Sequence, residues 1–139
     1  MPEPTKTFYV AGRTRNAEMV SDVVSLLREQ GMEPTVDWTE VHDVHKPYVE
    51  HIGENREWAD AFMRGVQNAD FVVLLGYDAQ GTRGTYIELG IALGAGVKQI
   101  IWAIDLSAED QSVFMCCSAV TLFDGTPEEF MKILPSLIL

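Results

Sequence analysis

Continuous runs of apolar residues recur along the chain and predict buried β-strands. The clearest runs are residues 7–11, 71–75 and 99–104, which are rich in β-branched and aromatic side chains. Weaker runs cover residues 33–38, where Pro34 limits the run to a strand start or an edge strand, and residues 120–123. Because these runs do not alternate with polar residues, we expect both faces of each strand to be buried, as in a parallel sheet.

Apolar residues at helical spacing lie between most of these runs. Residues 17–30 show this spacing, with Asn16 as the candidate N-cap and Gly31 as the stop; residues 56–68 show it again, as does the stretch from Thr85 to the glycines at 94 and 96. A capping box, Thr126 to Glu129 with proline at the first helical position, predicts the last helix. Residues 39–55 have no clear period and predict a long surface connection.

The alternation of strands and helices predicts a doubly wound (flavodoxin- or Rossmann-like) α/β fold. Its parallel sheet is expected to have about five strands, with helices on both faces. The chain of 139 residues contains no repeat, linker or low-complexity segment, so one domain is expected over residues 1–139. In such folds ligands bind at the carboxyl ends of the strands.

Composition and charge exclude several classes of partner. The net charge is −11 and the pI is about 4.5, so the surface repels nucleic acids and anionic lipids. The apolar runs are too short to cross a bilayer and the amino terminus shows no signal peptide, so a cytoplasmic protein is expected. Cys116 and Cys117 are adjacent, which makes them poor candidates for a disulfide; we expect them to be buried packing residues.

The loop after the first predicted strand is a candidate anion site. Gly12 permits close approach to the backbone, and Arg13 and Arg15 place two cations near the start of a helix. The alternative is that both arginines are solvated or pair with some of the 21 acidic side chains. Glycine beside two arginines in such a loop favours binding of a phosphate group.

The loop after residues 71–75 is the second candidate. Gly81 and Gly84 free the backbone, and Thr82 offers a hydroxyl to phosphate or ribose oxygens. Glu88 follows about one turn into the next helix. It is either a catalytic carboxylate or a first-turn glutamate that the helix dipole stabilises and that caps Thr85.

Residues 7–15 (TFYVAGRTR), 68–75 (NADFVVLL) and 84–101 (GTYIELGIALGAGVKQII) resemble the nucleoside 2-deoxyribosyltransferase superfamily, especially its 2′-deoxynucleoside 5′-monophosphate N-glycosidase branch. The resemblance implies that Glu88 is the catalytic nucleophile and that Tyr9 contacts it. Arg15 and Thr82 then match phosphate-binding positions of the hydrolases. Ser118 matches a phosphate-binding serine that, in the hydrolases, a neighbouring subunit contributes to the site. A homodimer or higher homo-oligomer is therefore expected.

Two features depart from the family pattern. The family has an aspartate on the preceding helix, eight residues before the acidic residue that opens the third strand; with Asp70 as that residue, the position holds Phe62. Asp60 lies half a turn away and is the candidate to protonate the leaving base. The chain also ends in the hydrophobic residues SLIL, whereas the transferases complete a neighbour's site with a polar terminus.

The resemblance implies an N-glycosidase that releases the base from a (deoxy)nucleoside 5′-monophosphate and requires no cofactor. The alternatives are a nucleoside 2-deoxyribosyltransferase, a non-catalytic nucleotide-binding or sensing module and, more remotely, a TIR-like NAD-cleaving enzyme. His42, His45 and His51 lack a known metal-ligand spacing, so no metal site is predicted. Trp38 or Tyr48 is expected to stack on the base.

Overall fold

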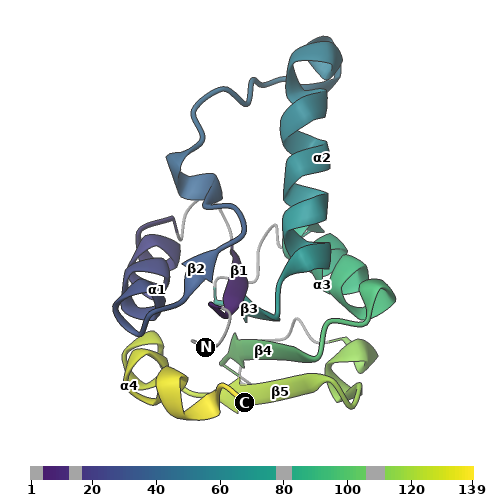
Figure 1. Ribbon diagram of the computed structural model, residues 1–139. Helices are drawn as coiled ribbons and strands as arrows, with labels where there is room; N and C mark the ends of the chain where they lie inside the picture. Colours follow the sequence, from purple (N-terminus) through teal and green to yellow (C-terminus); the bar gives the residue numbers. More distant parts are fainter. Residues whose placement is uncertain (1–4, 13–16, 78–82, 106–111) are drawn as a thin grey trace.

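The computed structural model describes residues 5–12, 17–77, 83–105 and 112–139. Five parallel strands form one sheet in the order β2-β1-β3-β4-β5 (Figure 1). The strands are β1 (Thr7–Ala11), β2 (Glu33–Pro34), β3 (Phe71–Leu75), β4 (Gln99–Ile104) and β5 (Val120–Asp124), and the helices are α1 (Ala17–Glu29), α2 (Ile52–Asn68), α3 (Arg83–Ala95) and α4 (Pro127–Leu137). The predicted doubly wound α/β fold is therefore confirmed.

Helices cover both faces of the sheet, and each face has its own core. In Figure 1, α1 and α4 lie on one side of the strands and α2 and α3 on the other. Alternate residues of β1 enter opposite cores: Phe8 and Val10 pack with α1 and α4, whereas Tyr9 and Ala11 pack with α2 and α3. All residues of β3 and β4 are buried, which agrees with their continuous apolar sequence.

Glycines end two of the helices where the sequence indicated. Gly31 has φ 85°, and the amides of Gly31 and Met32 bond to the carbonyls of Arg28 and Leu27 after α1. Gly96 has φ 73° and ends α3 with the same pair of bonds. This is the Schellman motif, in which glycine adopts the left-handed conformation without steric cost. At the start of α4, the Thr126 hydroxyl accepts a hydrogen bond from the Glu129 amide at 3.1 Å, as predicted.

Three sequence-based boundaries differ from the structure. The second strand covers only Glu33–Pro34, because Asp37 then caps a 3-10 turn at Trp38–Glu40 and ends the extended backbone. Helix α2 begins at Ile52, four residues before the predicted start. The remainder of the predicted long connection contains a second 3-10 turn, Tyr48–Glu50. A local side-chain cap, which an apolar period does not reveal, decides the first of these boundaries, whereas His51 before α2 and Pro47 before the second 3-10 turn make no side-chain cap bond.

The two cysteines correct another expectation. Both are free, but Cys116 is exposed and Cys117 is half-buried, so they are not core residues. They lie at the end of a 3-10 turn (Val113–Cys116) that covers the sheet through one residue, Met115. A short turn buries few of its side chains, and an apolar run in the sequence does not reveal which ones.

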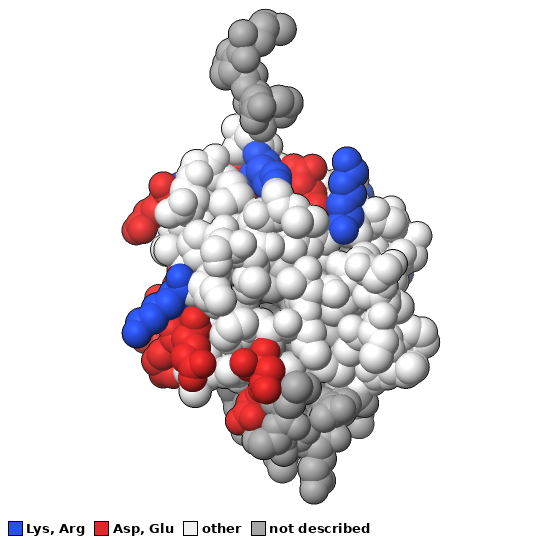
Figure 2. All heavy atoms as spheres, turned by 90° about the horizontal axis from the view of Figure 1, so that it is seen from below, with Lys and Arg blue, Asp and Glu red and all other residues white. Residues whose placement is uncertain are grey.

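The charge distribution agrees with the strongly acidic composition. On the face seen from below the view of Figure 1, Lys and Arg side chains stand apart from one another and Asp and Glu side chains gather in groups (Figure 2). Among the described residues, no helix has the length and hydropathy of a membrane span.

Candidate functional site

A cavity of about 730 Å³ opens beside the carboxyl end of β1. Its volume lies within the usual range for small-molecule sites, roughly 300–1,000 Å³. Three parts of the chain form its walls: the end of β1 with the start of α1, the connection between β2 and α2, and the facing sides of α2 and α3. The described lining residues are Tyr9, Gly12, Ala17, Trp38, Thr39, Val41, His42, Val44, Lys46, Tyr48, Ala59, Phe62, Met63, Gly84, Ile87, Glu88 and Ile91.

Glu88 and Tyr9 meet at this cavity. Tyr9 is in the interior of β1, and its side chain is almost completely buried on the α2 and α3 side of the sheet. Glu88 is in the second turn of α3 and is half-buried. The Tyr9 hydroxyl donates a hydrogen bond to the Glu88 carboxylate, which fixes the carboxylate at the cavity wall.

The surroundings of this pair shift both acidities upward. Burial raises the pKa of Glu88 from 4.5 to about 7, and the hydrogen bond from Tyr9 lowers it in part. Burial, followed by the negative charge of Glu88, raises the pKa of the Tyr9 hydroxyl far above its ordinary value, so Tyr9 remains a donor at every physiological pH. A carboxyl group with a raised pKa in a cleft is characteristic of functional sites.

Small residues permit this arrangement. Gly65 in α2 lies against β1, and a Cβ there would come 3.1 Å from Val36 and 3.3 Å from the Tyr9 ring. The Thr35 hydroxyl donates to the Gly65 carbonyl at 2.7 Å and ties the edge of the sheet to the same turn of α2. Gly84 lies over Glu88, with ordinary van der Waals room for a Cβ. Glycine at position 65 thus lets α2 approach the strand that carries Tyr9.

Two aromatic side chains line the wall formed by the β2–α2 connection. Trp38 is half-buried, and its Nε1 donates to the Val10 carbonyl at 2.8 Å, so the indole is fixed to the end of β1. Tyr48 is 56% exposed and has the Lys46 ammonium 5.6 Å from its ring centroid. Both aromatic rings offer a flat surface for a planar ligand group.

The structure brings some of the predicted site residues together. Tyr9, Gly12, Gly84 and Glu88 line one cavity, and so do Trp38 and Tyr48, the two residues suggested for stacking on a base. Arg13, Arg15, Gly81 and Thr82 lie outside the described residues, and their roles stay predictions.

Two other predicted residues do not line the cavity. Asp60 is exposed on α2 and does not line it, whereas Phe62, at the position where the family has its aspartate, does. Asp60 is therefore not part of the cavity wall that contains Glu88, and its role as the acid stays a prediction. Ser118 is exposed and lies outside the lining as well, and its predicted role in a neighbouring subunit stays a prediction.

Sequence reasoning missed Lys46 and His42 as lining residues. Both belong to the aperiodic connection, where no pattern indicates which side chains turn inward. His42 lines the cavity, while His45 and His51 lie beside Glu54 at the start of α2. Within the described part of the chain, no group of three or more His, Cys, Asp or Glu residues is arranged to hold a metal ion.

A five-stranded parallel sheet with a carboxylate and a cavity at its carboxyl edge defines a doubly wound α/β protein, and the cavity is a candidate small-molecule site. Its fold is similar to the solved structure of the CMP N-glycosidase BcmB from Clostridium botulinum, with a TM-score of 0.66. The match covers 94% of this chain and 99% of that chain at 18% sequence identity. The fold implied by the sequence resemblance is thereby confirmed. No protein-family model matches the sequence, and no curated protein matches it.

Proposed function

We propose that this protein is an N-glycosidase that hydrolyses the N-glycosidic bond of a nucleoside or deoxynucleoside 5′-monophosphate, with Glu88 as the nucleophile. The observation that carries the proposal is the Glu88 carboxylate, held by Tyr9 in the wall of a cavity of nucleotide size. Two further observations support it: the aromatic wall of Trp38 and Tyr48, and the similarity of the fold to that of a CMP N-glycosidase.

The proposed reaction has two steps. In the first, the ionised Glu88 carboxylate bonds to the anomeric carbon of the sugar while the bond to the base nitrogen breaks. The bonding pair leaves with the base, which takes up a proton from solvent and departs as free base. In the second step, water attacks the same carbon and gives up a proton to solvent while the glycosyl–glutamate ester bond breaks, so that sugar 5-phosphate and the Glu88 carboxylate result. Tyr9 holds the carboxylate in position throughout.

Substrate binding follows from the composition of the walls. The base stacks against the aromatic side of the cavity at Trp38 and Tyr48, where a planar ring makes its largest apolar contact. The 5′-phosphate binds to Arg15 and Thr82, as the sequence resemblance implies, and Arg13 supplies a second cation in the same loop as Arg15. An acidic protein needs such local cations, because its overall field repels the phosphate.

A product assay tests the proposal. The protein is incubated with a panel of ribo- and deoxyribonucleoside monophosphates, and free base and sugar phosphate are measured by chromatography. Release of base by the wild type, and its loss in Glu88→Gln, is the expected result. Glu57→Gln, a change of the same chemistry at an exposed position of α2, is the matched control and retains activity. Base release that persists in Glu88→Gln would remove the proposed nucleophile.

The same assay separates the alternatives. New nucleoside that forms only after addition of an acceptor base would identify a deoxyribosyltransferase. A non-catalytic nucleotide-binding module is the second candidate, because Asp60, the predicted acid, is exposed and does not line the cavity. Calorimetric binding of nucleotides without turnover, unchanged in Glu88→Gln, would favour that module over the enzyme.

A further inference from the structure

One wall of the cavity is formed by residues 42–50, a segment whose side chains are not packed into the hydrophobic core. Val44, Lys46 and Tyr48 line the cavity, yet every residue from 42 to 50 is exposed. Burial therefore contributes little to the position of this segment, and other contacts must fix it.

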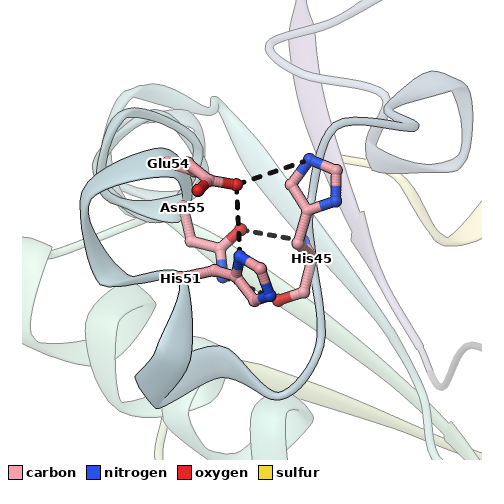
Figure 3. Close-up of polar contacts among 4 residues, drawn as sticks. All are labelled: His45, His51, Glu54 and Asn55. Carbon is pink, nitrogen blue, oxygen red and sulfur yellow. Dashed lines mark hydrogen bonds and ion pairs between the residues drawn. The ribbon is translucent and has the colours of Figure 1, made fainter.

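Asn55 in the first turns of α2 supplies such contacts. Its Oδ1 accepts a hydrogen bond from the His45 amide at 2.9 Å, and its Nδ2 donates to the His45 carbonyl, also at 2.9 Å (Figure 3). One side-chain amide thus satisfies both backbone groups of a single residue. Among the described residues, these are the hydrogen bonds that residues 42–46 make.

Glu54 adds a weaker contact on the same side. Its Oε2 lies 3.9 Å from His45 Nε2 and 3.2 Å from His51 Nδ1, so one carboxylate oxygen faces both imidazole rings (Figure 3). The two rings have centroids 5.5 Å apart. Since all of these groups except His45 belong to α2 or its cap, they tie the segment to that helix.

The helix that receives these contacts also lines the cavity. Ala59, Phe62 and Met63 lie one to two turns after Asn55 and form the facing wall. A segment tied to the first turns of α2 therefore keeps a fixed position relative to Phe62. Without the tie, the segment between the two 3-10 turns would have many accessible conformations, and binding would have to order it.

We infer that Asn55 is a positioning residue: by clamping the backbone of His45, it holds Lys46 and Tyr48 at the cavity so that they contact the substrate. Asn55 itself does not line the cavity. The part of this inference that concerns substrate rests on the proposed function. The part that concerns the clamp depends only on the two hydrogen bonds.

Steady-state kinetics of Asn55→Ala with the best nucleotide substrate test the effect on binding. Loss of two neutral hydrogen bonds to an exposed segment is expected to raise KM about tenfold, equivalent to about 1.4 kcal/mol, with kcat within about threefold of the wild type. The control is Asn68→Ala, an exposed asparagine at the other end of α2, which is expected to leave both constants unchanged. An unchanged KM in Asn55→Ala would overturn the inference, as would a fall in kcat alone.

Hydrogen exchange without nucleotide separates this inference from the proposed function. In Asn55→Ala the peptides that contain the His45 amide, the hydrogen-bonded amide of this segment, are expected to exchange faster than in the wild type, while those of β3 and β4 stay protected and show that the protein is folded. If exchange of the peptides that contain the His45 amide does not change, the clamp is refuted whatever the enzyme does. If the wild type releases no base from any nucleotide, the proposed function fails. The exchange result still shows whether Asn55 fixes the backbone of His45.

Discussion

The Tyr9 hydroxyl donates its hydrogen bond to the carboxylate of Glu88, so a residue in the middle of β1 holds a residue in the second turn of α3. The two side chains come from elements that are 79 positions apart in sequence and meet on one face of the sheet. The bond stabilises the charged form of Glu88, whereas burial opposes it. The balance of these two effects determines how much nucleophile is present at a given pH.

The first prediction is a pH profile. Glu88 acts as a nucleophile only when ionised, and burial raises its pKa to about 7. We therefore expect kcat/KM of the wild type to rise as the pH increases from 5 to 8, with a midpoint near 7 that reports the free enzyme. Initial rates with one nucleotide in buffers of constant ionic strength measure it. A profile that is flat across this range would contradict the role of Glu88.

The second prediction concerns Tyr9→Phe. The variant loses the hydrogen bond that lowers the pKa of Glu88, so the midpoint of the pH profile is expected to move upward. A hydrogen bond to a charged group is worth about 1.5–3 kcal/mol, so activity at pH 7 should fall roughly tenfold to a hundredfold. The fall should be smaller at pH 9, where a larger fraction of Glu88 is ionised in the variant than at pH 7. An equal loss at every pH would indicate that Tyr9 acts on the substrate instead.

The third prediction links the site to stability. The pKa of Glu88 is raised in the folded state, so the folded protein binds the proton more tightly than the unfolded chain between pH 4.5 and about 7. The stability due to the protonated carboxyl is complete below pH 4.5 and is lost as the pH rises through 7. Glutamine cannot ionise, so Glu88→Gln does not lose this stability as the pH rises. The variant is expected to have a free energy of unfolding about 1–3 kcal/mol higher than the wild type at pH 8, with a smaller difference at pH 5.

Urea unfolding of Glu88→Gln at the two pH values provides the measurement, and Glu57→Gln is the control. Both substitutions remove one negative charge from an acidic protein, but Glu57 is exposed. A gain that is equal in the two variants would mean that net charge, not the site, is responsible. Glu88 is only half-buried, which keeps the expected gain below that of a fully desolvated carboxylate.

The sheet was predictable from the sequence because its signal is local. The run at residues 71–75 is apolar at every position, and the structure forms β3 over those same residues, buried throughout. The length of the second strand was overestimated, because side chains after Pro34 form hydrogen bonds with α2 and β1. Thr35 donates to the Gly65 carbonyl and Trp38 to the Val10 carbonyl. The pattern of apolar residues in the sequence does not reveal those tertiary contacts.

Part of the candidate site was predictable for the same reason. Glu88 and Tyr9 follow from a family resemblance over local motifs, Gly84 follows from the glycine-rich loop, and all three line the cavity. Asp60 shows the limit of this reasoning. The lining residues of α2, Ala59, Phe62 and Met63, form an i, i+3, i+4 stripe that ends at the buried Val66, and Asp60 falls outside that stripe. Lys46 lies on an irregular segment, for which periodicity offers no guide.

The last prediction concerns Gly76, which follows β3 and lies beside the Trp102 side chain. A Cβ at this position would come 2.6 Å from Trp102 Nε1 and 3.1 Å from the Ala103 carbonyl oxygen. Trp102 is 2% exposed and packs edge-on against Tyr86, so the indole has little room to move. Gly76→Ala is therefore expected to destabilise the protein by about 1–3 kcal/mol, the usual cost of overpacking.

Thermal or urea unfolding of Gly76→Ala measures this cost, and Gly90→Ala provides the comparison. Gly90 lies within α3 and has open space around its missing Cβ. Alanine there is expected to stabilise the protein by about 0.5–1 kcal/mol, because it favours the helix and meets no neighbour. The two alanine substitutions should thus act in opposite directions. If Gly76→Ala is as stable as the wild type, the close packing of Trp102 against the end of β3 is not a constraint on this fold.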